Sequence, residues 1–276
     1  MDERIYLARA ALHMWEEPCI SGTKGSGTVF FSGCGLRCCF CQNHDIAIGS
    51  RGRAVSVERL GEIFLELKEK GAANINLVTG AHYVPQIIEA LDMARRKGLD
   101  IPVVYNSSGY EKTETLKLLE GYVDIYLPDL KYLDPELAQK FSNAPDYVQA
   151  AKAAIGEMMR QTGKCEFGED GYIRKGTIVR HLILPGHTGN SIKALRYLHE
   201  TYGEDIYISI MNQYTPVRKF VEFKELNRKV TKREYEKVLD AAVDMGIQNG
   251  FIQEGETASE SFIPDFDYEG VEKNTP

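Results

Sequence analysis

The chain of 276 residues has few cysteines, no long apolar run and no excess of positive charge. Because no stretch of about eighteen consecutive apolar residues occurs, a membrane-spanning helix is not expected. The formal net charge of −7 argues against nucleic acid as the main partner, since phosphate binding depends on clustered Lys and Arg. Six cysteines in a chain of this length, with no signal-peptide pattern, do not indicate a disulfide framework. We therefore expect a cytoplasmic protein that binds neither a membrane nor nucleic acid.

No internal repeat or low-complexity linker divides the chain, so a single domain is expected. Apolar runs rich in β-branched and aromatic residues alternate with amphipathic helical stretches, which is typical of βα units around a parallel sheet. The strand candidates are 28–32, 75–79, 102–106, 124–129, 177–184 and 205–211. The helix candidates are 60–70, 84–97, 113–119, 147–161 and 191–202, followed by a last helix at 232–245 and a short strand at 250–253.

This pattern divides the chain into three parts. A core of residues 28–253 is preceded by an N-terminal segment, 1–27, which we expect to pack on it, and followed by an acidic tail, 254–276. The tail contains Phe262, Ile263, Phe266 and Tyr268. It is either a loosely docked surface segment or a cover that packs its aromatic side chains over one end of the core.

Three cysteines, Cys34, Cys38 and Cys41, follow the first predicted strand with C-x3-C-x2-C spacing. A [4Fe–4S] cluster normally takes four Cys ligands, so three on one loop leave one iron open to a substrate or cofactor. The alternative is a zinc site completed by His44, but a large α/β chain needs no metal to fold. Cys39, which breaks the spacing, is interpreted as a small buried hydrophobe.

The cysteine loop, in which Phe40 precedes the third cysteine, resembles the cluster loop of radical S-adenosylmethionine (SAM) enzymes. Asp129-Leu130-Lys131 and the stretch 180–186 resemble segments of pyruvate formate-lyase activating enzyme and its homologues. The resemblance spans residues from about 9 to 270. It implies an α/β fold of the partial (β/α)6 barrel type, a [4Fe–4S] cluster and SAM as cofactors, and reductive cleavage of SAM to a 5′-deoxyadenosyl radical.

In barrels of this kind, ligands gather at the C-terminal ends of the strands. The resemblance implies that Cys34, Cys38 and Cys41 hold the cluster. Together with the polar strand ends, it gives these candidates for contact with SAM: Phe40, Asn43, Thr79, Gly80, Asn106, Ser108, Asp129, Lys131, Arg180, Asn212 and Gln213. Arg180 is expected to meet the SAM carboxylate. No acidic residue stands beside Thr79-Gly80, where the family often carries one, so recognition there would rest on main-chain atoms.

The substrate step is less defined by the sequence. Cys19 could donate a hydrogen atom or touch the substrate, and a buried inert thiol is the competing interpretation. The implied activity is hydrogen abstraction, either from a glycine of a partner protein or from a small molecule or peptide. A non-catalytic iron–sulfur or zinc protein is the alternative of another class. The expected partners are an electron donor such as flavodoxin or ferredoxin, and a protein substrate in the first case.

Overall fold

A computed structural model describes residues 4–253 and 264–273, and parallel strands dominate its sheet. The strand order is β10-β9-β8-β6-β5-β4-β2-β1-β3, and every neighbouring pair from β2 to β10 is parallel. The parallel strands are β2 (Ser26–Phe31), β4 (Ile75–Val78), β5 (Val103–Ser107), β6 (Ile125–Pro128), β8 (Ile173–Leu182), β9 (Tyr207–Met211) and β10 (Gly250–Ile252). The short β7 (Glu166–Phe167) pairs antiparallel with β8.

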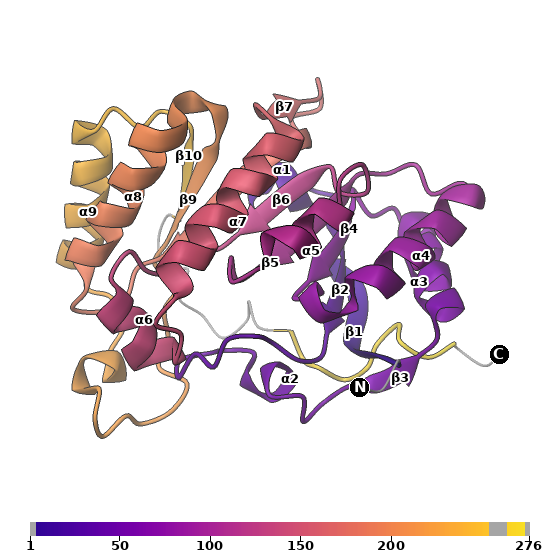
Figure 1. The fold of residues 1–276 in the computed structure, drawn as a ribbon, viewed down its shortest axis with the longest axis horizontal. Helices are drawn as coiled ribbons and strands as arrows, with labels where there is room; N and C mark the ends of the chain where they lie inside the picture. Colours follow the sequence, from indigo (N-terminus) through magenta and orange to yellow (C-terminus); the bar gives the residue numbers. More distant parts are fainter. Residues whose placement is uncertain (1–3, 254–263, 274–276) are drawn as a thin grey trace.

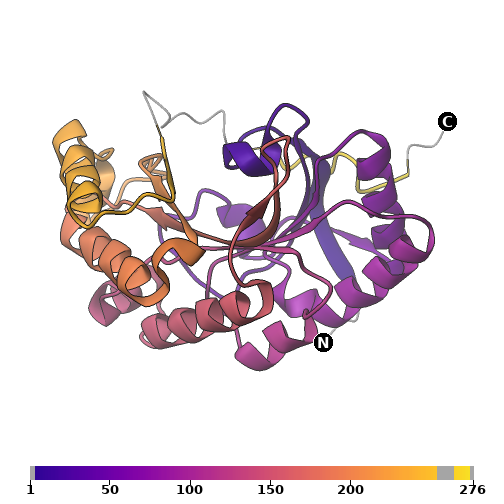
Figure 2. The same cartoon turned by 90° about the horizontal axis from the view of Figure 1, so that it is seen from above.

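Helices follow the strands and lie around the outer face of the curved sheet (Figures 1 and 2). They are α3 (Val57–Glu69), α4 (Val84–Arg96), α5 (Thr113–Leu118), α6 (Pro135–Ser142), α7 (Tyr147–Thr162), α8 (Thr188–Tyr202) and α9 (Lys232–Asp244). Short 3-10 turns are η1 (Ala81–Tyr83), η2 (Gly203–Asp205) and η3 (Lys224–Asn227). Each of the predicted strands and helices is present within a few residues of its expected bounds. The predicted α/β class and the parallel, single-domain arrangement are thus confirmed.

The N-terminal segment contributes a strand of its own. β1 (Ile5–His13) pairs antiparallel with β2, and β3 (Arg53–Val55) pairs antiparallel with β1. The sheet therefore begins well before residue 28, where the sequence had placed the start of the core. After β1 the chain turns onto the inner face of the sheet, where α1 (Pro18–Ser21) lies opposite the helical layer (Figure 2). The buried Ile20 of α1 packs there against Val104 and Ile125.

The described part of the tail runs beside β1. The Tyr268 N–H donates to the Ala8 carbonyl at 3.1 Å, and the Ala10 N–H donates to the Glu269 carbonyl at 2.8 Å. Gly270 has a φ of 70°, and a Cβ there would lie 2.0 Å from the Ala10 carbonyl oxygen, so this approach requires glycine. Phe266 packs edge to face on Phe30 of β2 with 5.4 Å between ring centroids.

Residues 264–273 are thus held along one side of the sheet, while Phe262 and Ile263 lie outside the described residues. Within the described ranges, no helix has both the length and the apolar character needed to span a membrane.

Candidate functional site

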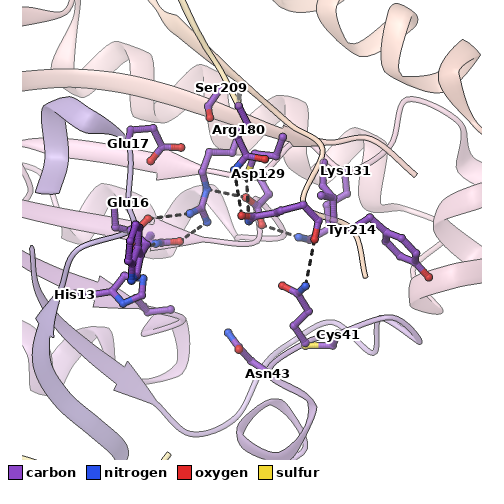
Figure 3. A pocket seen from close by; sticks show the side chains of 18 of the residues that line it. His13, Glu16, Glu17, Cys41, Asn43, Asp129, Lys131, Arg180, Ser209 and Tyr214 are labelled. Carbon is purple, nitrogen blue, oxygen red and sulfur yellow. Dashed lines mark hydrogen bonds and ion pairs between the residues drawn. The ribbon is translucent and has the colours of Figure 1, made fainter. Parts of the chain in front are cut away.

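A cavity of about 470 Å³ opens where the parallel strands end, which is within the range of small-molecule sites (Figure 3). Nine of the predicted site residues line it: Cys38, Phe40, Cys41, Asn43, Asn106, Asp129, Lys131, Arg180 and Gln213. Five others belong to the same loops without lining the cavity: Cys34, Thr79, Gly80, Ser108 and Asn212. The sequence candidates from separate strands are therefore largely brought together.

The cysteine loop leaves β2 through a turn that only glycine fits. Gly33 has a φ of 101°, and a Cβ there would lie 2.9 Å from the Nε2 atom of His82. The same Nε2 atom lies 2.8 Å from the Ser32 carbonyl oxygen, which fixes the imidazole against the loop. On the far side, the Cys39 N–H donates to the Phe141 carbonyl at 2.7 Å. The loop is therefore clamped between η1 and the end of α6.

The thiol of Cys38 is the acceptor at the end of a short chain of hydroxyls. The Ser142 hydroxyl lies 3.0 Å from the Cys38 Sγ atom, and the Tyr132 hydroxyl lies 2.8 Å from the Ser142 Oγ atom. Burial raises the pKa of the neighbouring Cys41 thiol to about 12, a shift that Cys38 reinforces and Lys131 opposes. A coordinated metal would remove these thiol protons.

The cysteines are not arranged as ligands of a single ion. In the described ranges, no three His, Cys, Asp or Glu side chains come together around one metal position. His44, the fourth ligand in the zinc interpretation, is 52 % exposed and lies 3.7 Å from the Asp45 carboxylate. A mononuclear zinc site is therefore disfavoured. Three thiolates on one loop fit a cluster instead, since each binds a different iron.

Asp129, Lys131 and Arg180 form a largely buried ion network at the ends of β6 and β8. The Lys131 Nζ atom lies 2.6 Å from one Asp129 carboxylate oxygen, and the Arg180 Nε atom lies 3.0 Å from the other (Figure 3). Burial opposes ionisation of Asp129, but the two cations outweigh it and lower the pKa of that carboxyl. Burial likewise opposes the charge of Lys131, while Asp129 and Cys38 raise its pKa. All three side chains therefore remain charged near neutral pH.

Glu16, which the sequence did not single out, completes this network from the other side. Its carboxylate accepts from Arg180 Nη1 at 3.2 Å, from Asn76 Nδ2 at 3.1 Å and from Asn106 Nδ2 at 3.3 Å. Asn106 Oδ1 in turn accepts from Arg180 Nη2 at 2.6 Å. Three N–H groups of Arg180 thus donate to protein partners. Fewer N–H groups remain for the SAM carboxylate than the sequence-based interpretation assumed.

The turn that follows β5 is held by contacts with α7 and with the residues that follow β6. Gly109 has a φ of 75°, and a Cβ there would lie 2.2 Å from the Asp129 carbonyl oxygen. The Tyr147 hydroxyl of α7 lies 2.9 Å from the carbonyl oxygens of both Ser108 and Asp129, and it accepts from the Lys131 N–H at 2.9 Å. Ser108 thereby contributes its backbone to a local turn, and its side chain does not line the cavity.

The ends of β4 and β9 complete the site. Thr79 has a φ of 60°, a left-handed conformation that is strained for a β-branched residue and tends to occur at functional sites. The Asn212 N–H donates to Gln253 Oε1 at 2.9 Å, and Gln253 Nε2 donates to Gln213 Oε1 at 3.0 Å. Gln42 of the cysteine loop reaches the Gln213 carbonyl at 3.4 Å. These amides connect the cysteine loop to β9 and β10.

Cys19 lies apart from the cavity lining. It is buried in α1 within an apolar cluster that includes Ile20, Ile173 and Ile178. Burial, reinforced by Glu17, raises the pKa of this thiol to about 12. The geometry gives no support to contact between Cys19 and a substrate, and it favours the inert thiol.

The acidic and aromatic residues ahead of Cys19 are the ones that sequence reasoning missed. His13, Trp15, Glu16 and Glu17 line the cavity from the segment between β1 and α1. Two adjacent carboxylates followed by a proline in an otherwise apolar stretch were the available signal. That signal does not reveal which strands lie opposite.

The chain resembles known proteins both in sequence and in fold. The family model described as the Radical SAM superfamily matches residues 28–198. An uncharacterized protein of Methanocaldococcus jannaschii is 28% identical over 244 residues, which is 86% of this chain and 67% of that protein. Pyruvate formate-lyase-activating enzyme of Clostridium pasteurianum is 27% identical over 113 residues, which is 39% of this chain and 46% of that enzyme.

Among solved structures, Streptococcus suis SuiB bound to precursor peptide SuiA matches with a TM-score of 0.53 and 15% identity. The match covers 81% of this chain and 47% of SuiB, so the chain spans about half the length of that protein. At this identity the likeness concerns the fold alone. The family match covers more than half of the chain, and it includes the cysteine loop and the network at β6 and β8. This protein therefore belongs to the radical SAM superfamily, whose members bind a [4Fe–4S] cluster and SAM.

Proposed function

We propose that this radical SAM enzyme cleaves SAM reductively and abstracts a hydrogen atom from a substrate group that enters the cavity described above. The observation that carries the proposal is the convergence of the cysteine loop and the Asp129–Lys131–Arg180 network on one cavity of about 470 Å³. When bound, the cluster and SAM supply the 5′-deoxyadenosyl radical. The protein supplies position, charge and shielding.

Within this proposal, Cys34, Cys38 and Cys41 hold the cluster. The donor set fits, because three free thiols stand on one clamped loop and each can bind a different iron of a cluster. Lys131 places a positive charge near these thiols and offsets part of their negative charge on ligation. Phe40 and Asn43, from the same loop, line the cavity where SAM would lie.

The segment between β1 and α1 forms one wall of the cavity. Its Glu16 is held by Arg180, Asn76 and Asn106, so this wall is fixed by bonds to three strands. A fixed wall restricts water at the place where a reactive radical would form. It also brings side chains that can recognise a substrate, which favours a small molecule or a peptide side chain.

A protein glycine is the second candidate substrate, and the similarity to pyruvate formate-lyase-activating enzyme over 113 residues supports it. A cytoplasmic location and an electron donor such as flavodoxin or ferredoxin are further parts of the proposal.

The test is anaerobic reconstitution with iron and sulfide, followed by dithionite and SAM, with 5′-deoxyadenosine measured by chromatography. We expect 5′-deoxyadenosine to form in wild type and to be absent in Cys41→Ala. Cys39→Ala is the matched control, because Cys39 lies on the same loop outside the three-cysteine spacing. A fully reconstituted protein that binds SAM but yields no 5′-deoxyadenosine would refute the proposal.

A further inference from the structure

Glu17 is a buried carboxylate on the cavity wall with an unfilled hydrogen-bonding position. It is only 9 % exposed, and its Oε2 atom has no hydrogen-bond partner among the described residues. Glu17 stands at the N-cap position of α1, yet its side chain does not cap the helix. The side chain lines the cavity instead, as Ser209 does, and burial raises the pKa of the Glu17 carboxyl while hydrogen bonding by the Ser209 hydroxyl acts to lower it (Figure 3). A carboxylate buried in this way is costly unless a partner arrives.

The charges around the cavity leave Glu17 without a counter-ion. Lys131 lies 2.6 Å and Arg180 lies 3.0 Å from the Asp129 carboxylate, and Arg180 also lies 3.2 Å from Glu16. Both lining cations are therefore committed to the other two acids, and no ion pair within the described ranges includes Glu17. Burial raises the pKa of Glu17, and the more distant Arg180 opposes this only in part. The cavity wall thus has a place for one additional positive charge.

The neighbours of Glu17 suit a cation carried on an apolar stem. Trp15, Pro18 and Phe251 line the same cavity. Aromatic faces attract ammonium and guanidinium groups and also pack against methylene chains. Cys41 and Asn43, on the cysteine loop, lie on the other side of the cavity from Glu17 (Figure 3). A ligand group at Glu17 is therefore separate from the group that would meet the cluster.

We propose that Glu17 anchors a substrate subsite for a protonated amine or guanidinium group. The inference rests on the proposed function, because it names the group that a substrate brings to the same cavity. Such a group would donate to the unfilled Oε2 atom and neutralise the carboxylate, while its stem packs against Trp15 and Phe251.

The experiment uses the chain's single tryptophan, Trp15, as a reporter. The reconstituted protein, with SAM bound and the cluster left oxidised, is titrated with n-butylammonium, n-butylguanidinium, n-butanol and butyrate while tryptophan emission is recorded. We expect the two cations to bind at least about tenfold more tightly than butanol or butyrate. Acetyl-Gly-Lys-Gly-amide is titrated in parallel. Tighter binding of this peptide than of n-butylammonium assigns the cation to a peptide side chain, and the reverse assigns it to a small amine.

Glu17→Gln keeps the shape of the side chain and removes its charge. We expect this variant to lose at least about tenfold in affinity for n-butylammonium while iron content and SAM binding stay at the wild-type level. Glu89→Gln, at an exposed position on α4, is the matched control and should bind like wild type.

Equal affinity of wild type and Glu17→Gln for the cation, or displacement of SAM by the cation, overturns the inference. Because the titration needs no turnover, its outcome is independent of whether 5′-deoxyadenosine forms.

Discussion

Arg180 and Asp129 are joined across neighbouring parallel strands by both side chain and backbone. Arg180 Nε donates to Asp129 Oδ1 at 3.0 Å, and the backbone N–H of Leu130, the residue after Asp129, donates to the Arg180 carbonyl at 2.8 Å. Arg180 also reaches Glu16 at 3.2 Å. One arginine therefore connects the ends of two strands to the N-terminal segment that lines the cavity.

Asp129→Asn should lower both stability and SAM affinity. The substitution leaves Lys131 and Arg180 partly buried with only Glu16 to balance them. We expect the free energy of unfolding to fall by about 3 kcal/mol in anaerobic urea titrations. Asp240→Asn, at an exposed position on α9, should change it by less than about 0.5 kcal/mol. The double variant Asp129→Asn with Lys131→Met should lose less than the sum of the single changes, because it removes both partners of one pair.

An unchanged unfolding midpoint together with normal SAM affinity would show that the network matters neither for folding nor for the cofactor. Equilibrium dialysis of SAM against the reconstituted variant gives the second of these measurements.

Metal analysis should distinguish the three cysteines that are proposed to hold the cluster from Cys39, the fourth cysteine of the same loop. Replacement of Cys34, Cys38 or Cys41 by Ala should abolish the visible charge-transfer absorption, since wild type is expected to hold about four irons and four sulfides. Cys39→Ala should keep full iron and sulfide content. Stoichiometric zinc in wild type without visible absorption would contradict the cluster assignment.

Ser142 should tune the cluster through its hydrogen bond to Cys38. The Ser142 hydroxyl lies 3.0 Å from the Cys38 Sγ atom. Hydrogen bonds to ligating sulfurs stabilise the more negative, reduced state of a cluster. Ser142→Ala should therefore move the midpoint potential to a more negative value, as followed by electron paramagnetic resonance during a redox titration. Ser50→Ala, at an exposed position, serves as the control. A potential that stays at the wild-type value would rule out this contact as a tuning bond.

Cys19→Ser should affect folding and leave the chemistry intact. The cysteine is buried among apolar side chains, so a serine hydroxyl there costs about 1–3 kcal/mol of folding free energy. Iron content, SAM affinity and 5′-deoxyadenosine yield should match those of wild type. Loss of product formation with normal SAM cleavage would instead show that Cys19 takes part in the reaction with the substrate.

Glu111 should make stability fall as the pH rises. Burial raises its pKa from the ordinary 4.5 to about 7, against the hydrogen bonds from Ser107 and Tyr105. Between these values the folded protein holds a proton that the unfolded chain has released, so increasing pH favours unfolding. Relative to Glu111→Gln, wild type should lose up to about 3 kcal/mol between pH 4.5 and pH 8. Urea unfolding of both proteins at several pH values checks this. If the free energy of unfolding changed with pH in the same way in both proteins, the raised pKa of Glu111 would be contradicted.

The sequence by itself determined the alternation of strands and helices and the chemistry of the cysteine loop. Runs such as Ile75–Val78 and Ile125–Pro128 are buried throughout and, apart from Asn76, apolar, as is typical of strands covered on both faces. The spacing of Cys34, Cys38 and Cys41 is local, so it could be read without knowing any partner. Asp129 and Lys131 are likewise two residues apart, so the two-residue period of extended backbone predicted side chains on one face, and the structure pairs them just after β6 ends at Pro128.

Tertiary structure alone decided the role of the N-terminal segment. Residues 5–13 are rich in Ala and Leu, which favour helices, and they form β1 because β2 and β3 pair with them. Glu16 meets Arg180, a residue 164 positions later, and no local pattern encodes a contact over that separation. Glu17 lies beside the same cavity for the same reason. The role of a buried charge depends on the groups that surround it in space, and these groups come together only once the strands have assembled.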